Sequence, residues 1–175
     1  MDDVMTGKIK PVKMVLFDVD GVMTDGSISY SDTGDEIKTF NVRDGHGVKL
    51  LMRAGLEVGL LTARQAMATE HRAKNLGITK VFQGMKEKLP AFERILKENN
   101  LKASEVAYMG DDIIDLPVLK RAGFSATVSD AAVEVLSVVD YVAKLPGGRG
   151  AVREVCEVIL KAQGKWDEIM SRYTV

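Results

Sequence analysis

Residues 13–26 are KMVLFDVDGVMTDG, a short apolar run followed at once by aspartates and glycines. The run at residues 13–17 predicts a buried strand, and the loop after it carries Asp18 and Asp20 with one residue between them. Both carboxylates can therefore reach the same crevice at the end of the strand. The plain alternative is a turn that contains aspartate and glycine because these residues suit turns after strands.

Outward from this segment, short apolar runs alternate with helical patterns along the chain. The predicted strands are residues 13–17, 57–61, 80–82, 106–109, 124–128 and 141–143. The predicted helices are residues 47–54, 66–76, 89–99, 116–122, 131–136 and 151–162, several of them closed by Gly55, Gly77 or Gly123. This alternation predicts an α/β fold: a three-layer, doubly wound, mostly parallel Rossmann-like sheet, with ligands bound at the carboxyl ends of the strands.

One segment interrupts the alternation. Residues 27–30 and 36–41 are short β-like runs on either side of the turn-rich sequence Ser31-Asp32-Thr33-Gly34-Asp35. This arrangement predicts a small β-hairpin inserted after the first strand, at about residues 26–42. The insertion is too short for a second domain, so we expect a single domain over residues 1–175.

Composition places the chain among ordinary globular proteins. Its 175 residues are 46% hydrophobic and 28% charged, with a formal net charge of −1, which excludes a disordered chain and a generally basic surface for nucleic acid or anionic lipid. Cys156 is the single cysteine, so we expect a buried thiol and a cytoplasmic location. No apolar stretch is long enough to span a membrane. His46 and His71 lack partners at metal or triad spacing, so we interpret both as structural or exposed.

Polar residues also follow three more of the predicted strands. Thr62 follows the second strand, Lys88 follows the third, and Asp111, Asp112 and Asp115 follow the fourth. Each has an ordinary alternative, because Thr62 could cap a helix, Lys88 could be a solvated surface lysine, and the aspartates suit a helix N-terminus. Their convergence on one edge of one sheet favours a functional site.

A hydroxyl, a lysine and several carboxylates at one edge predict metal-assisted phosphoryl transfer. Two carboxylates and a phosphate dianion held ~4 Å apart would repel one another by several kcal/mol per pair, and a divalent cation relieves this repulsion. Oxygen ligands favour Mg²⁺, and the sequence has no cluster of histidine and cysteine that would favour zinc. Lys88 would add a second positive charge, and Thr62 a hydrogen bond to a phosphoryl oxygen.

Together these motifs resemble the haloacid dehalogenase superfamily over nearly the whole chain. The resemblance rests on four ordered motifs, Asp18-x-Asp20-Gly21-Val22-x-Thr24, Thr62, Lys88 and Gly110-Asp111-Asp112-x-x-Asp115. Further segments resemble the 3-deoxy-D-manno-octulosonate 8-phosphate (KDO 8-phosphate) phosphatases, namely Phe40-x-x-Arg43-Asp44-Gly45-x-Gly47, Thr62-x-Arg64, Gln83-Gly84 and the run GGRGAVRE at residues 147–154. Ala63 replaces the glycine that is usual in that family, a departure outside the reacting groups.

The resemblance implies roles for the site residues. Asp18 would attack phosphorus to form an aspartyl-phosphate, and Asp20 would protonate the departing sugar alkoxide and then activate water. Mg²⁺ would be bound by the carboxylates of Asp18 and Asp111 and the backbone carbonyl of Asp20. Either Asp112 or Asp115 would support the metal from nearby. Aspartate rather than threonine at position 20 favours turnover as a hydrolase over the long-lived phosphoenzyme of the superfamily's ATPases.

The resemblance also implies a substrate and an assembly. It implies hydrolysis of KDO 8-phosphate in lipopolysaccharide biosynthesis by a homotetramer that lacks a cap domain and shares its active sites between subunits. Arg64 and Arg72 are candidates for binding the sugar carboxylate, and Arg149 for reaching the site from its loop; a solvated helix face and an ordinary loop charge are the alternatives. Two other functions remain open. One is a phosphatase for a nine-carbon keto-sugar acid 9-phosphate, which Arg64 disfavours, and the other is a non-catalytic binding protein on the same fold, which would usually lack a catalytic aspartate.

Overall fold

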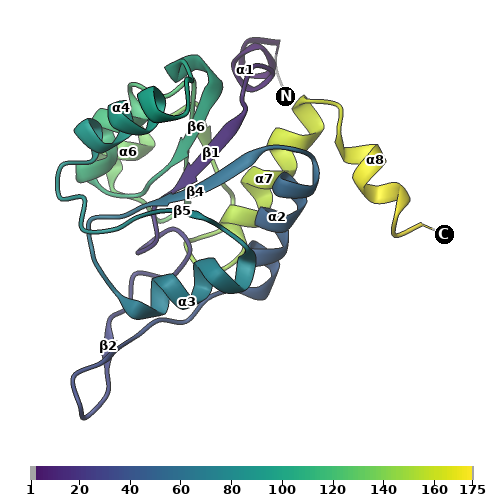
Figure 1. The fold of residues 1–175 in the computed structure, drawn as a ribbon. Coiled ribbons are helices and arrows are strands. Elements are labelled where there is room, and N and C mark those ends of the chain that lie inside the picture. The colour runs from purple at the N-terminus through teal and green to yellow at the C-terminus, as the bar shows by residue number, and fades with distance from the viewer. Residues whose placement is uncertain (1–2, 175) are drawn as a thin grey trace.

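The computed structural model describes residues 3–174, and its centre is a six-stranded sheet in the order β5-β4-β1-β6-β7-β8 (Figure 1). The strands are β1 (Met14–Phe17), β4 (Glu57–Leu61), β5 (Lys80–Phe82), β6 (Val106–Met109), β7 (Phe124–Thr127) and β8 (Tyr141–Val142). All neighbouring strands in this sheet pair in parallel. The predicted parallel sheet is therefore confirmed, and β1, which ends just before Asp18, is a central strand buried along its whole length.

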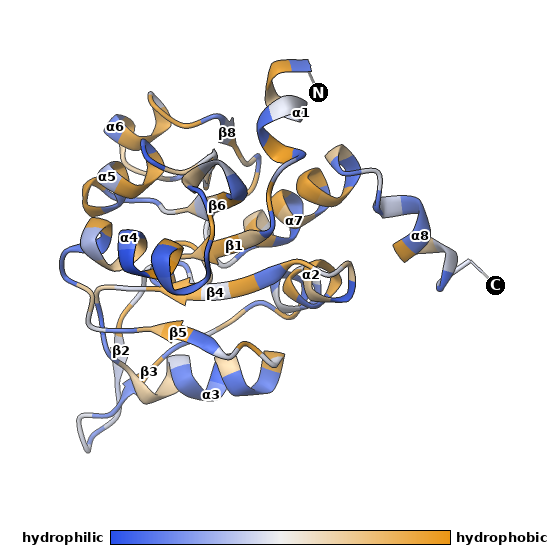
Figure 2. Cartoon of the chain, turned by 45° about the horizontal axis from the view of Figure 1, so that its top comes forward, coloured by the Kyte–Doolittle hydropathy of each residue, from blue (hydrophilic) through white to orange (hydrophobic). Residues whose placement is uncertain are grey.

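Helices cover both faces of the sheet: α2 (Val42–Arg53), α3 (Met67–Leu76) and α7 (Ala151–Ala162) on one face, and α4 (Lys88–Glu98), α5 (Leu116–Leu119) and α6 (Val133–Leu136) on the other. Alternate residues of β1 point to opposite faces and so belong to two separate cores. Val15 and Phe17 contact the first group of helices, whereas Met14 and Leu16 contact the second. Figure 2 shows the resulting layers, with hydrophobic central strands between helices that are hydrophilic on their outer sides.

The predicted bounds agree with β4, β5, β6 and α7, and differ by one or two residues at most other elements. The predicted start of α2 is wrong, because this helix begins at Val42 rather than at residue 47. The side chain of Asn41 accepts hydrogen bonds from the backbone N–H groups of Arg43 (2.8 Å) and Asp44 (3.4 Å). This N-cap offsets the weakening effect of the two glycines, Gly45 and Gly47, in the following turns.

Other differences lie at short or terminal elements. Helix α5 ends at Leu119 rather than at residue 122. The sequence patterns did not predict α1 (Asp3–Ile9), α8 (Trp166–Ser171) or the 3-10 turns η1 (Ala103–Glu105) and η2 (Ile113–Asp115). Over residues 3–174, no helix has both the length and the apolar character needed to cross a membrane.

The predicted insertion is confirmed as a hairpin, formed by the antiparallel strands β2 (Ser29–Tyr30) and β3 (Glu36–Ile37). Its strands are shorter than the predicted runs at residues 27–30 and 36–41. The hairpin projects from the body of the molecule as an arm (Figure 1). Ile28, Tyr30 and Ile37 are 49%, 63% and 52% exposed on it. The arm therefore presents apolar side chains away from the core of its own chain.

Candidate active site

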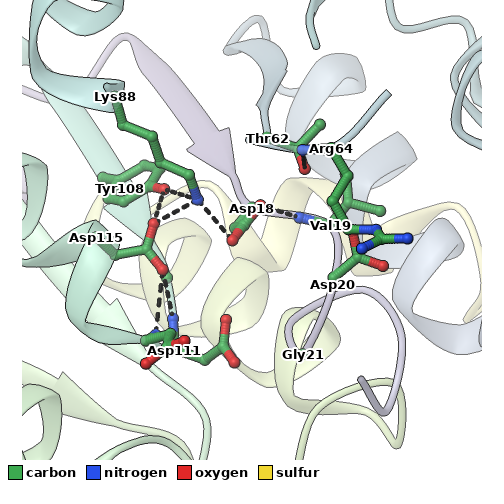
Figure 3. A network of polar contacts seen from close by, with 12 residues as sticks. Asp18, Val19, Asp20, Gly21, Thr62, Arg64, Lys88, Tyr108, Asp111 and Asp115 are labelled. Atoms are coloured by element: carbon green, nitrogen blue, oxygen red, sulfur yellow. Dashed lines mark hydrogen bonds and ion pairs between the residues drawn. The ribbon is translucent and has the colours of Figure 1, made fainter. Parts of the chain in front are cut away.

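The site lies at the carboxyl ends of β4, β1 and β6, which are neighbours in the sheet. Asp18 follows β1, Thr62 follows β4, and Asp111 comes two residues after β6. Lys88 is the first residue of α4, on the chain that leaves β5. The structure thus brings together the four groups that the sequence places after separate strands, and Figure 3 shows their side chains facing one centre. The open ends of parallel strands meet at this edge, as expected for a doubly wound sheet.

Lys88 is the hub of a buried polar network (Figure 3). Its ammonium donates to Asp18 Oδ2 and to Asp115 Oδ1, at 2.6 Å each, and to the hydroxyl of Tyr108 at 3.2 Å. Its side chain is 0% exposed. Burial alone would lower the pKa of Lys88, but the charges of Asp18 and Asp115 outweigh that effect and raise it. The lysine therefore stays charged beside Asp18 and holds one of its carboxylate oxygens.

Asp115 positions the loop that carries Asp111. Its Oδ2 accepts hydrogen bonds from the backbone N–H groups of Asp111 (3.0 Å) and Asp112 (3.2 Å), while its Oδ1 also accepts one from the Tyr108 hydroxyl at 2.5 Å. Asp115 is fully buried, whereas Asp112 is exposed and caps the backbone N–H of Ile113. Of the two aspartates that the sequence left open, Asp115 is therefore the one that lies in the centre of the site.

The carboxylates of Asp18, Asp111 and Asp115 form a cluster whose ligand atoms lie within 4.8 Å of one another. One oxygen of Asp111, Oδ1, is buried and has no hydrogen-bond partner among the described residues. Burial and the neighbouring carboxylates raise the pKa of Asp111 to about 8, and burial, partly offset by Lys88, raises that of Asp18 to about 6. Such crowding of oxygen donors with an unpaired carboxylate oxygen fits a hard divalent cation such as Mg²⁺.

Gly21 leaves the space that this arrangement requires. A Cβ atom at position 21 would lie 2.0 Å from Oδ2 of Asp111, and the backbone there has a φ of +80°. Any other residue would clash with a carboxylate of the cluster and strain the loop after Asp18. The glycine of the first motif is therefore explained by close approach of the β1 loop to the β6 loop.

Asp20 is held by residues of the hairpin that the sequence analysis did not single out. Lys38 forms an ion pair with Asp20 Oδ1, and a second one, at 2.6 Å, with Glu36 Oε1. Arg64 donates to Glu36 Oε2 at 2.6 Å, and its Nε lies 4.0 Å from Asp20 Oδ2. Burial would lower the pKa of Lys38, but its hydrogen bonds to the two carboxylates raise it. A chain of alternating charges thus joins the arm to the loop after β1.

A hollow of about 250 Å³ opens beside these groups and is lined by residues that include Asp18, Asp20, Thr62, Arg64 and Asp111. Arg64 therefore lies at the site, as the sequence analysis anticipates, with 41% of its side chain exposed at the mouth. Thr62 is buried, and its Oγ1 accepts a hydrogen bond of 3.4 Å from the backbone N–H of Arg64. The hollow thus combines acidic groups at its base with a cation at its rim.

Arg72 and Arg149 do not reach this hollow in their own chain. Arg72 donates to the backbone oxygen of Asn41 at 2.9 Å, and its guanidinium lies 5.4 Å from the centre of the Phe40 ring. Arg149 pairs with Asp25 at 3.2 Å and lines a different hollow of about 460 Å³. Within one chain, Arg72 secures the end of the hairpin and Arg149 pairs with the loop after β1.

The segment at residues 147–150 packs directly on the loop that follows Asp18. The backbone N–H of Gly148 donates to the carbonyl of Val22 at 3.0 Å, and a Cβ at Gly147 would lie 1.8 Å from the carbonyl oxygen of Gly21. Only glycine permits such contact between two backbones. This segment of the GGRGAVRE run therefore supports the active-site loop from behind.

Comparison with known proteins adds three findings. A family model of haloacid dehalogenase-like hydrolases matches residues 78–152. The 3-deoxy-D-manno-octulosonate 8-phosphate phosphatase KdsC of Escherichia coli (strain B / BL21-DE3) is 45% identical over 166 residues, which cover 95% of this chain and 88% of that protein. The crystal structure of the corresponding phosphatase from Moraxella catarrhalis, in complex with magnesium, phosphate and KDO, matches with a TM-score of 0.97 at 38% identity, covering 99% of this chain and 100% of that one. The likeness therefore extends over the sheet, the hairpin and the hollow alike.

Proposed function

The chain belongs to the KDO 8-phosphate phosphatase family of haloacid dehalogenase-like hydrolases, and from this we propose that it hydrolyses KDO 8-phosphate to the free sugar acid and phosphate, in lipopolysaccharide biosynthesis. The resemblance that the sequence motifs indicate is thereby confirmed. The observation that carries the proposal is the buried contact of Asp18 with Lys88, at 2.6 Å, beside the unpaired carboxylate oxygen of Asp111. This arrangement presents a nucleophilic oxygen to a phosphoryl group and balances the charge around it.

We propose two chemical steps for the residues of this chain. In the first, an oxygen of Asp18 attacks phosphorus, the bond from phosphorus to the sugar oxygen breaks, and Asp20 gives that oxygen its proton. In the second, water attacks the aspartyl-phosphate, its proton passes to Asp20, and the bond from Asp18 to phosphorus breaks to release phosphate. Lys88 and Thr62 would stabilise the phosphoryl oxygens, with Lys88 also orienting Asp18.

The acidic cluster is the place for Mg²⁺ in this proposal. The carboxylates of Asp18 and Asp111 and the backbone carbonyl of Asp20 would hold it, and Asp115 would support it by fixing the loop of Asp111. When bound, the cation supplies charge neutralisation between the carboxylates and the phosphate and polarises the phosphoryl group. The acidic cluster, whose ligand atoms lie within 4.8 Å of one another, and the magnesium of the Moraxella catarrhalis structure both support this assignment.

We further propose a homotetramer whose subunits complete one another's sites. The hollow of about 250 Å³ is smaller than the ~300–1,000 Å³ typical of sites that enclose a whole ligand, so the sugar acid would extend beyond it. The arm carries exposed Ile28, Tyr30 and Ile37 and the open edges of a two-stranded sheet, both of which favour pairing with another chain. The predicted contact of Arg72 with the sugar carboxylate would then be made in a neighbouring subunit's site. The cytoplasmic location stays a prediction, favoured by the free, buried Cys156.

Relative turnover across a panel of sugar-acid phosphates tests the proposed function. The magnesium-loaded protein should release phosphate from KDO 8-phosphate with a kcat/KM at least about 10-fold above that for a nine-carbon keto-sugar acid 9-phosphate, a difference of about 1.4 kcal/mol. A preference for the nine-carbon compound would mean that the proposed substrate is wrong, whereas the proposed phosphatase mechanism would stand. A protein that hydrolyses neither of these compounds nor an aryl phosphate would instead be a binding protein on this fold.

A further inference from the structure

We infer that Lys38, on the hairpin, is a positioning residue that holds the carboxylate of Asp20 in the orientation needed for proton transfer. This inference deepens the proposed function and rests on its assignment of Asp20 as the acid. It gives the hairpin a part in the chemistry of its own chain, separate from any contact with a neighbouring subunit.

The first observation is the unusual burial of Lys38. Its side chain is 2% exposed, although it follows directly after Ile37, which is 52% exposed on the same arm. Lys38 is the first residue after β3, and its side chain lies inward against Asp20 and Glu36 whereas that of Ile37 lies outward. An ammonium group is buried only when charged partners compensate for its lost hydration. Lys38 has two such partners, Asp20 and Glu36.

The second observation is that the two carboxylate oxygens of Asp20 have different contacts. Lys38 contacts Oδ1, whereas Oδ2 is buried without a hydrogen-bond partner among residues 3–174. Asp20 also lines the hollow that contains Asp18. With one oxygen anchored, rotation of the carboxylate is restricted. The other oxygen, whose ion pair with Arg64 Nε spans 4.0 Å, makes no hydrogen bond to any described residue and can carry the proton. Orientation of this kind is a recognised source of rate enhancement, because a misplaced acid must first be reordered.

The third observation is that Lys38 is itself held in place. Glu36 Oε1 lies 2.6 Å from its ammonium, and Glu36 Oε2 accepts a hydrogen bond from Arg64 at 2.6 Å. Lys38 therefore approaches Asp20 from a fixed direction rather than as a mobile surface lysine. A salt bridge that served only to attach the arm would also have this appearance, so the test must separate attachment from orientation.

Substrates with different leaving groups distinguish the orientation of Asp20 from simple attachment of the arm. A poor leaving group such as a sugar alkoxide needs its proton during bond cleavage, whereas a good one such as a nitrophenolate does not. The kcat/KM of the magnesium-loaded protein is measured for KDO 8-phosphate and for a series of aryl phosphates whose phenols differ in acidity. The variants are Lys38→Met and Lys38→Gln, with Lys38→Arg as the conservative replacement, Asp20→Asn as the benchmark, and Lys97→Met, at an exposed site on α4, as the matched control.

We expect Lys38→Met and Lys38→Gln to lower kcat/KM for KDO 8-phosphate by about 100-fold, at the lower end of what general acids contribute. They should lower it only a few-fold for the best aryl leaving group, and so steepen the dependence on leaving-group acidity in the manner of Asp20→Asn. Lys38→Arg should restore most of the activity. Thermal melting shows which variants are folded, and Lys38→Gln serves if Lys38→Met is not.

One outcome would overturn the inference: Lys38→Met and Lys38→Gln leave the leaving-group dependence unchanged while Asp20→Asn changes it. This holds whether kcat/KM stays as in the wild type or falls by the same factor for all substrates. The proposed function fails differently: wild-type protein would then not turn over KDO 8-phosphate, or Asp20→Asn would leave the leaving-group dependence unchanged. The aryl series can be measured in either case.

Discussion

Asp44 caps helix α7 although it lies in α2, because its Oδ1 accepts a 2.8 Å hydrogen bond from the backbone N–H of Arg153. Its Oδ2 accepts a second bond, of 3.2 Å, from the N–H of Gly150. The first N–H groups of a helix have no partner within it and carry partial positive charge, so a buried carboxylate suits them. Asp44 thus links the motif at residues 40–47, to which it belongs, with the motif at residues 147–154. Since residues 147–150 support the loop after Asp18, both motifs help to hold the active-site loop.

Replacing Asp44 should weaken the fold more than replacing an exposed aspartate. Asp44→Ala leaves the buried N–H of Gly150 and the partly buried N–H of Arg153 without this acceptor, so we expect the free energy of unfolding to fall by about 1–3 kcal/mol, measured with urea. Asp32→Ala, at the exposed turn of the arm, is the control and should change it by less than about 0.5 kcal/mol. Equal stability of the two variants would mean that Asp44 does not support α7.

Removal of the metal should abolish turnover reversibly. Chelation leaves the carboxylates of Asp18 and Asp111 facing the phosphate, with Lys88 as the cation in contact with Asp18, so phosphate release should stop and return when Mg²⁺ is added back. Asp111→Ala should raise the Mg²⁺ concentration needed for half-maximal activity by at least about 10-fold. The metal assignment is wrong if exhaustively chelated protein keeps its full activity.

The stabilising effect of Mg²⁺ should increase with pH. The pKa of Asp111 is raised from 3.8 to about 8, first by burial and then by Asp18 and Asp115. Without metal, the folded chain keeps a proton there that the unfolded chain loses, so its stability falls as pH rises towards about 8. Mg²⁺ binds the ionised form. The increase in Tm on adding Mg²⁺ should therefore be larger at about pH 9 than at about pH 6; an equal increase would contradict the raised pKa.

The arm should control assembly separately from chemistry. Ile28→Ser with Ile37→Ser removes exposed apolar groups but keeps Lys38, so light scattering should show smaller assemblies that lose selectivity for the sugar phosphate and keep aryl phosphate hydrolysis. Removal of residues 27–39 also removes Lys38 and should additionally steepen the dependence on leaving-group acidity. A selective, fully active monomer would remove the shared-site proposal.

Much of the fold could be predicted from sequence because it depends on local patterns. The buried strands β4, β5 and β6 are short apolar runs between polar segments, and their bounds were predicted without error. The predicted helix over residues 47–54 begins five residues after the observed start of α2 at Val42, and Gly45 and Gly47 lie in the first turns of α2. The role of these glycines is tertiary: a Cβ at Gly47 would lie 3.0 Å from the Cα of Arg153 on α7, and a Cβ at Gly45 would lie 2.3 Å from Nη2 of Arg72 on α3.

The site was predictable only where its residues follow strands. Asp18, Thr62 and Asp111 are found from strand ends alone, because the topology of a parallel sheet brings such positions together. Lys38 gave no signal, since a lysine on a hairpin is ordinarily exposed, and its burial depends on how the arm lies over Asp20. Tyr108 likewise looks like an ordinary strand residue until its hydroxyl is seen to bond Asp115.

The central claim is that catalysis passes through a phosphorylated Asp18, and trapping that intermediate tests it most directly. Asp20→Asn should slow hydrolysis of the aspartyl-phosphate, whereas an aryl phosphate, as a good leaving group, can still form it. The magnesium-loaded variant is mixed with aryl phosphate, quenched in acid and digested, and its peptides are weighed by mass spectrometry. We predict a phosphoryl group on the peptide that contains Asp18, and none after the further change Asp18→Asn. A phosphoryl group on another residue, or full turnover by Asp18→Asn protein, would contradict the account.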